Sequence, residues 1–220
     1  VIVRKGEKMP RCVIFTAGDQ HGIEKHEIGL RHDDFVICCD AGYRLAQRLS
    51  VRPDLLLGDF DSYTGALPED IPVRRYIRDK DDTDTVIAVR YALEQGYDSI
   101  LLVAATGGRL DHLLGNLQIL AFISEHAPGT AAEILGSHER VWLLDGGSLS
   151  IQGKPESTFS VLCHSDRAEG VSIQGARFGL DNAVMTNRFP LGISNRIGDD
   201  RVATISVESG ILFVIYPKEV

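Results

Sequence analysis

Short apolar runs in the first half of the chain alternate with stretches that repeat apolar residues every three or four positions. The runs are RCVIFTAG, FVICCDAG, DLLLGDFDS and DSILLVAATGG. They are apolar at nearly every position rather than at every second one, as is typical of strands covered on both faces. We therefore expect strands within residues 11–18, 35–42, 54–62 and 98–108.

Two stretches between and after these runs have the periodicity of helices. TDTVIAVRYALEQG places Val86, Val89, Ala92 and Leu93 on one face and ends at Gly96, a residue that commonly follows a helix. LDHLLGNLQILAFISEHAPG repeats apolar residues on one stripe and closes with Pro-Gly. The predicted stripe consists of Leu110, Leu113, Leu114, Leu117 and Leu120. Strands that alternate with helices predict an α/β layer with a mainly parallel sheet.

The pattern changes after Pro128. AEILGS, RVWLLDGGSLSI, TFSVLCH and VATISVESGILFVIYP are separated by Gly, Ser, Asn and Asp, with no long helical stripe. This pattern predicts an antiparallel β sandwich or barrel of about six to eight strands. We expect an α/β domain over residues 1–128 and an all-β domain over residues 129–220.

Composition and charge narrow the classes of function. The chain has 44% hydrophobic and 25% charged residues and a net charge of −8, which argues against a nucleic-acid-binding surface. No apolar run approaches the ~20 residues of a membrane helix, and the N-terminus has no signal-peptide core. The four cysteines show no C-x-x-C spacing and indicate buried, reduced thiols. We expect a cytoplasmic protein without a membrane or nucleic-acid partner.

Acidic residues follow three of these predicted strands and one further strand-like run, VRRYI. Asp40 follows the second run, Asp59 and Asp61 the third, a group from Asp79 to Asp84 comes after VRRYI, and Asp111 lies just beyond the fourth. Ligands of open α/β sheets bind outside the carboxyl ends of the strands. Neighbouring carboxylates disfavour joint ionisation, and a hard cation such as Mg²⁺ removes that conflict. The acids therefore predict a magnesium site, although an isolated Asp pair can also cap a turn or helix.

The segment TGGRLDH carries a candidate anion site. Gly107 and Gly108 lie between a predicted strand and a helix, where backbone N–H groups can face a phosphate, and Arg109 can donate two hydrogen bonds to it. Taken alone, two glycines in a loop more often form a plain turn. Lys80 and Thr83 are further phosphate candidates, with a solvated surface charge as the alternative for Lys80. The chain has neither a P-loop nor a G-x-G-x-x-G fingerprint.

Together, the segments CDAG, GDFDS, DKDDTD and GGRLDHLLGN resemble, in order and spacing, the thiamine pyrophosphokinase family. GARFGLDNAVM and LGISNRI are similar to segments of the family's second half, so the resemblance spans most of the chain. It implies an N-terminal α/β domain that binds ATP and a C-terminal β domain that binds thiamine and dimerises. It also implies pyrophosphoryl transfer from ATP to the thiamine hydroxyl, a need for Mg²⁺, and a homodimer with active sites between subunits.

The resemblance also assigns roles to individual residues. The catalytic candidates are Asp59, Asp61, Asp84 and Asp111. The metal-binding candidates are Asp40, Asp59, Asp61, Asp81 and Asp84. The candidates for binding ATP are Lys80, Thr83, Thr106, Gly107, Gly108, Arg109 and Asn116. His112 is interpreted as a structural residue at the start of a helix.

Thiamine carries a cationic thiazolium ring, which aromatic faces attract. Phe178 is the aromatic candidate, with packing in the β core as the alternative. Ser194 and Asn195 are candidates for hydrogen bonds to the pyrimidine ring, with a turn as the alternative. GARFGL departs from the family pattern because Ala176 and Arg177 stand near its usual lysine.

Two other functions remain as alternatives. A phosphatase of the aspartyl-phosphate type uses D-x-D-x-[TV], but here Tyr63 follows Ser62 and Thr64 comes one place late. A non-catalytic nucleotide or thiamine sensor on the same fold would have lost one or more of the acids, and this chain keeps them.

Overall fold

The structure is a computed structural model that describes residues 11–60, 63, 65–76 and 82–218. The chain divides into two compact units, one ending at His138 and the other continuing from Glu139 to the C-terminus. The first unit contains both helices and strands, and the second contains strands, which confirms the predicted fold class.

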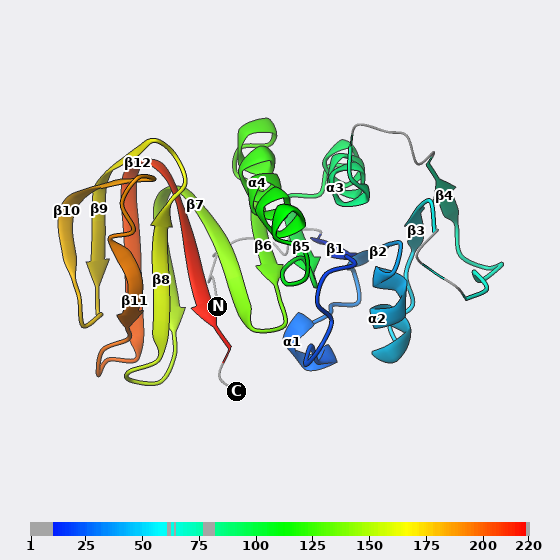
Figure 1. Ribbon diagram of the computed structural model, residues 1–220, viewed down its shortest axis with the longest axis horizontal. Coiled ribbons are helices and arrows are strands. Elements are labelled where there is room, and N and C mark those ends of the chain that lie inside the picture. The colour runs from blue at the N-terminus through cyan, green and yellow to red at the C-terminus, as the bar shows by residue number, and fades with distance from the viewer. Residues whose placement is uncertain (1–10, 61–62, 64, 77–81, 219–220) are drawn as a thin grey trace. The chain divides into compact units, whose positions relative to one another are not determined.

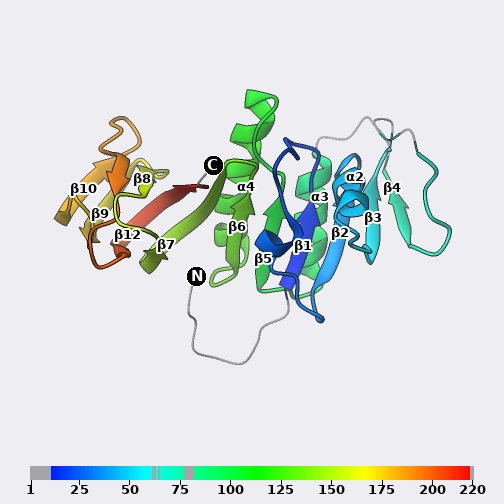
Figure 2. The same ribbon diagram turned by 90° about the horizontal axis from the view of Figure 1, so that it is seen from below.

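The described residues of the first unit form a sheet in the order β6-β5-β1-β2-β3-β4, in which every pair of neighbours is parallel (Figures 1 and 2). Its strands are β1 (Arg11–Phe15), β2 (Phe35–Cys39), β3 (Leu55–Gly58), β4 (Val73–Arg75), β5 (Ser99–Val103) and β6 (Ala131–Leu135). The helices are α1 (Lys25–Ile28), α2 (Gly42–Arg48), α3 (Asp84–Glu94) and α4 (Leu110–His126).

Helices cover both faces of this sheet: α1 and α2 lie on one face, and α3 and α4 lie on the other (Figure 1). Val13 and Phe15 of β1 belong to the buried cluster that includes Leu45 of α2. Cys12 and Ile14 alternate with them and are equally buried on the opposite face. This two-sided burial explains why the runs are apolar at consecutive positions.

Helices α3 and α4 confirm the two predicted helical stretches. Thr83 caps α3 by accepting a hydrogen bond from the N–H of Val86 at 3.3 Å. The predicted stripe on α4 is wrong for Leu110 and Leu114, which are 70% and 52% exposed. Leu120 of the predicted stripe is buried, and it forms the buried face of α4 with Ile119 and Ile123. No helix in the described part of the chain is long and apolar enough to cross a membrane.

The strand β6 corrects the interpretation of AEILGS. The sequence pattern favours a strand of the β domain, but β6 pairs in parallel with β5. The helix α4 provides the crossover between these two strands, so β5, α4 and β6 form one βαβ unit. The domain boundary itself stays a prediction.

The second unit is built from antiparallel strands. They are β7 (Glu139–Gln152), β8 (Thr158–Cys163), β9 (Arg167–Gln174), β10 (Leu180–Thr186), β11 (Gly192–Arg196) and β12 (Val202–Pro217). The first half of β12 pairs with β9 and its second half pairs with β8, while β7 pairs along both halves. The register breaks between Val207 and Ile211, where Gly210 adopts a φ of 93°. One long strand therefore passes from one layer of the β unit to the other.

Candidate active site

The first unit has a topological switch point beside β1. The chain runs outward from β1 through β2 and β3 to β4, and then returns to place β5 on the other side of β1. The loops after β1 and β5 consequently leave the sheet in opposite directions, and ligands of open α/β sheets bind where this happens. The sheet order thus predicts a site near Gly18 and Gly107.

A cleft of about 580 Å³, which we call the switch-point cleft, lies at this position. Its residues come from the ends of β1, β2 and β5 and from the starts of α3 and α4. They include Thr16, Ala17, Gly18, Asp19, Cys39, Asp40, Thr83, Asp84, Thr85, Ala105, Gly107, Gly108, Arg109, His112 and Asn116. The volume falls within the ~300–1,000 Å³ of small-molecule sites.

The backbone around the cleft is strained. Asp40, Phe60 and Ala104 follow β2, β3 and β5, and their φ angles are 43°, 59° and 59°. Positive φ angles cost a non-glycine residue ~1–3 kcal/mol and persist only where the surroundings impose them. Three such residues after strands of the same parallel sheet indicate a functional site.

Asp40 is held in one position by the loop that follows β3. Its Oδ1 accepts a hydrogen bond from the N–H of Phe60 at 3.0 Å. A Cβ on Gly58 would lie 2.0 Å from the same Oδ1, and Gly58 has a φ of 143°. Glycine is therefore required before the first aspartate of GDFDS, because any side chain there would displace Asp40.

The carboxyl group of Asp40 is hydrogen-bonded to that of Asp84, and the charge of Asp59 also acts on Asp40. Burial and the hydrogen bond with Asp84 raise the pKa of Asp40 to about 7, although the Phe60 N–H opposes the change. Two acids that share a proton form a site that favours a cation in the proton's place.

Part of the predicted metal set can be assessed in the structure. Asp61, Lys80 and Asp81 lie outside the described residues. Within the described part of the chain, no three His, Cys, Asp or Glu side chains gather closely enough to hold a metal ion. Asp59 and Asp84 each interact with Asp40. Mg²⁺ commonly binds one or two carboxylates together with substrate phosphates, so these oxygen donors fit that ion.

The glycine loop after β5 packs on the loop after β1. Gly107 and Gly108 have φ angles of 77° and 68°, and a Cβ on Gly107 would lie 2.5 Å from the Cβ of Asp19. The N–H of Asp19 donates to the carbonyl oxygen of Thr106 at 2.9 Å. Both glycines line the cleft directly before the 17-residue helix α4. Left-handed glycines at such a position can present backbone N–H groups to an anion.

Asp19 is a site residue that the sequence analysis missed. Its Oδ1 accepts from the N–H of His21 at 3.0 Å, and its Oδ2 accepts from Ser137 Oγ at 2.9 Å. These bonds hold the pKa of Asp19 below its usual value. The signal was present, because Asp19 follows the first apolar run as Asp40 follows the second.

The remaining nucleotide candidates lie around the start of α4. Arg109 donates to both carboxylate oxygens of Asp111, from Nε at 3.1 Å and from Nη2 at 2.6 Å. Asp111 therefore pairs with Arg109 and has a lowered pKa, and it is absent from the lining of the switch-point cleft. Asn116 donates from Nδ2 to the Ala105 carbonyl oxygen at 2.7 Å, which fastens α4 to the end of β5.

Thr106 is buried, and its Oγ1 has no hydrogen-bond partner among the described residues. A buried hydroxyl without a partner is unfavourable, and a ligand oxygen is one way to satisfy it.

The predicted thiamine residues lie together in the β unit. Phe178 is 60% exposed, so its core-packing alternative does not hold. Asn195 is 3% exposed and bonds to the backbone of Phe178 from both ends of its amide: Nδ2 donates to the Phe178 carbonyl at 2.8 Å, and Oδ1 accepts from the Phe178 N–H at 3.1 Å. Oδ1 also accepts from the N–H of Arg196 at 2.8 Å. Ser194 is exposed and has a φ of 57°.

Arg177, at the position near the family's lysine, lies beside these residues. Its Nη1 is 3.3 Å from Glu156 Oε2, which also pairs with Arg196 at 2.7 Å. Its guanidinium carbon lies 5.8 Å from the centre of the Phe178 ring. A cation therefore stands beside the exposed aromatic ring.

The fold and the cleft define a class: a doubly wound α/β protein with an acidic ligand site at its switch point and an all-β second unit. The family model described as thiamin pyrophosphokinase, catalytic domain, matches residues 28–129. The model described as thiamin pyrophosphokinase, vitamin B1 binding domain, matches residues 148–212. The chain belongs to the thiamin pyrophosphokinase family.

Individual relatives agree with this assignment. The thiamine pyrophosphokinase of Bacillus subtilis (strain 168) is 29% identical over 164 residues, which are 72% of this chain and 75% of the relative. A crystal structure of thiamin pyrophosphokinase from Geobacillus thermodenitrificans has a TM-score of 0.79 at 26% identity and covers 96% of this chain and 98% of its own. The yeast thiamin pyrophosphokinase structure shares the fold, with a TM-score of 0.75 at 14% identity over 97% of this chain and 88% of its own.

Proposed function

We propose that this protein transfers the pyrophosphoryl group of ATP to the hydroxyl of thiamine, giving thiamine diphosphate and AMP. The observation that carries the proposal is that the catalytic and vitamin B1 binding descriptions of the family match separate parts of the chain. The acidic switch-point cleft in the first unit supports it. The phosphatase and sensor alternatives have no comparable support.

In the proposed reaction, the thiamine hydroxyl oxygen forms a bond to the β-phosphorus of ATP, and the bond from that phosphorus to the α,β-bridging oxygen breaks. The hydroxyl proton passes to an aspartate, for which Asp59 and Asp61 are our candidates. AMP leaves with the bridging oxygen. Catalysis of this kind depends mainly on positioning the reactants and offsetting charge.

The chain's own groups divide that work. Asp40, Asp59 and Asp84, with Asp61 and Asp81, would hold Mg²⁺, which when bound offsets charge on the phosphate oxygens. The backbone N–H groups of Gly107 and Gly108 face the phosphates, and Arg109 supplies positive charge beside them. Lys80, Thr83 and Asn116 are further candidates around the nucleotide, and Asp111 is a further catalytic candidate.

For thiamine, we propose that the exposed ring of Phe178 contacts the thiazolium and that Ser194 contacts the pyrimidine. An aromatic face attracts such a cation by ~0.5–2 kcal/mol. Asn195 then acts by positioning Phe178, because its amide already bonds to the Phe178 backbone.

We further propose that residues 1–128 bind ATP and Mg²⁺, that residues 129–220 bind thiamine, and that the protein is a homodimer with active sites between subunits. Exposed apolar side chains in the β unit support an interface there: Phe189 is 65% exposed and Ile193 is 53% exposed. Light scattering should give twice the chain mass of 24.1 kDa, whereas a monomer would contradict the dimer. The unpaired cysteines fit a reducing compartment, and we propose the cytoplasm.

A single assay separates the three functions. The protein is incubated with ATP, Mg²⁺ and thiamine, and AMP is measured. AMP that forms only with thiamine supports the kinase. Phosphate released from a generic ester would support the phosphatase, and binding without turnover would support the sensor.

A further inference from the structure

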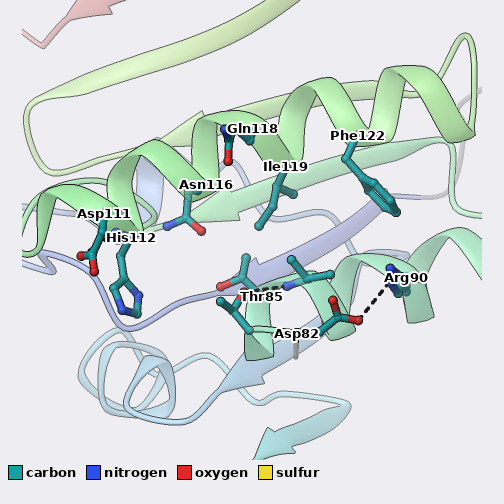
Figure 3. A pocket seen from close by; sticks show the side chains of 12 residues that line it. Asp82, Thr85, Arg90, Asp111, His112, Asn116, Gln118, Ile119 and Phe122 are labelled. Carbon is teal, nitrogen blue, oxygen red and sulfur yellow. Dashed lines mark hydrogen bonds and ion pairs between the residues drawn. The ribbon is translucent and has the colours of Figure 1, made fainter. Parts of the chain in front are cut away.

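A second cleft, of about 460 Å³, lies between α3 and α4, and we call it the α3–α4 cleft. Figure 3 shows Asn116 and Ile119 of α4 directed toward α3, with Thr85 on the opposite side. Val86 and Ile119 give the cleft apolar walls, and Gln118 adds a side-chain amide. Thr83, Asp111 and Asn116 line this cleft as well, whereas the glycines of the loop after β5 do not.

The α3–α4 cleft is continuous with the switch-point cleft. Thr83, Thr85, His112 and Asn116 line both. A ligand with an anionic end among the acids and the glycine loop can therefore extend a less polar end between the two helices.

Gly115 makes room in the α3–α4 cleft. It lies inside α4, where glycine is less favourable than alanine. Close packing does not explain it, because a Cβ at this position meets no atom within 4 Å. The open space above its backbone is part of the cleft.

Phe122 and Arg90 close the far end. The Arg90 guanidinium carbon lies 5.3 Å from the Phe122 ring centre, and Arg90 Nε lies 3.4 Å from Asp82 Oδ2 (Figure 3). His126 stacks on the Phe122 ring with the centres 4.0 Å apart. From Asn116 to Phe122 the helix rises about 9 Å, at ~1.5 Å per residue.

We propose that the α3–α4 cleft binds the nucleoside part of ATP, with the base over Gly115 between Val86 and Ile119 and with the Phe122–Arg90 pair as the end wall. This inference rests on the proposed function, since it assigns the base to one side of the same site. A planar base suits a slot with apolar walls, and the shared residues connect it to the triphosphate in the switch-point cleft. Contacts between the base and this cleft would let the protein distinguish a nucleotide from bare polyphosphate.

The test compares ATP with inorganic tripolyphosphate by calorimetric titration in Mg²⁺ without thiamine. The wild-type protein should bind ATP at least ~10-fold more tightly than tripolyphosphate. Gly115→Leu, which fills the slot, should remove most of that preference and leave tripolyphosphate binding unchanged. Glu125→Leu adds the same side chain to an exposed position of α4 outside the cleft and should leave both affinities unchanged.

Phe122→Ala keeps the test decisive if Gly115→Leu does not fold, and it should weaken ATP binding alone. Equal wild-type affinities for the two ligands would overturn the inference, and so would normal ATP binding by Phe122→Ala or by a folded Gly115→Leu. Its failure differs from that of the proposed function: a protein that prefers ATP but forms no AMP with thiamine would refute the reaction and retain the slot.

Discussion

At the scale of single residues, the geometry of the site depends on Gly58 and Asp40. Asp40 has a left-handed backbone, and its carboxylate occupies the space that a side chain at position 58 would need. Gly58 thus allows Asp40 to approach the loop that carries Asp59. The glycine of GDFDS is as necessary to the site as the aspartates.

Gly58→Ala should lower turnover ~100-fold, because an error of ~1 Å in a catalytic group has an effect of that size. The added strain should reduce the free energy of unfolding by ~1–3 kcal/mol. Gly96→Ala is the matched control, since Gly96 has a φ of 83° but open space around its Cβ position. It should destabilise the protein and leave turnover intact. Normal turnover in Gly58→Ala would contradict the role of Gly58.

Asp40→Asn should stabilise the metal-free protein while it lowers turnover at least ~100-fold. The asparagine amide can replace the proton that Asp40 and Asp84 share. The folded-state pKa of Asp40, about 7, lies above its ordinary 3.8. The folded wild type therefore binds an extra proton between these values, and its stability falls as pH rises through that interval.

Urea unfolding in EDTA, at about pH 5 and about pH 8, measures how much the free energy of unfolding falls because of the raised pKa of Asp40. Asp40→Asn should not show this fall, so the difference in the free energy of unfolding between the variant and the wild type should grow with pH. A variant less stable than the wild type at about pH 8 would refute the repulsion between Asp40 and Asp84.

At the scale of elements, β11 positions the loop that carries Phe178. The side-chain amide of Asn195 in β11 forms the two hydrogen bonds that a neighbouring strand would otherwise form with the Phe178 backbone. It donates to the Phe178 carbonyl and accepts from the Phe178 N–H. Burial leaves this amide little contact with solvent. Its effect on thiamine should therefore pass through the Phe178 ring.

Asn195→Asp should raise the KM for thiamine at least ~10-fold with a smaller effect on kcat and none on ATP, because a carboxylate oxygen would face the Phe178 carbonyl. Asn182→Asp makes the same chemical change at an exposed position of β10 and should behave as the wild type. Phe178→Ala and the double variant Phe178→Ala/Asn195→Asp should have nearly the same KM for thiamine, since each change removes the same contact, that between the Phe178 ring and thiamine. Additive effects would mean that Asn195 contacts thiamine by itself.

The elements also show how far the sequence predicts the fold. Continuous apolar runs and the period of α3 and α4 were sufficient to predict a parallel sheet with helices on both faces. They did not assign β6, because a five-residue run has the same pattern in either kind of sheet. Leu110 and Leu114 were placed on the buried face of α4, because periodicity alone does not give the rotation of a helix on its sheet.

The candidate site was predictable to a similar extent. The rule that acids follow strand ends identified Asp40 and Asp84, which the structure brings together. The same rule, applied to the residues that follow the first strand, would also have identified Asp19. The role of Asn195 could not be predicted, because it depends on a contact between residues 17 positions apart.

At the scale of the whole molecule, the two units match two separate family descriptions, one catalytic and one for vitamin B1 binding. The net charge of −8 repels a triphosphate over the molecule as a whole. Local positive groups and a divalent cation must offset that repulsion where ATP binds. The central claim is therefore that the strand-end acids act through a cation on ATP, for transfer to thiamine.

The most direct test measures AMP formed from ATP by the purified protein, with and without thiamine, before and after chelation of divalent cations. The account predicts AMP only when thiamine is present, loss of that activity in EDTA, and recovery when Mg²⁺ is restored. AMP formation that is indifferent to thiamine, or turnover that continues unchanged in EDTA, would contradict it.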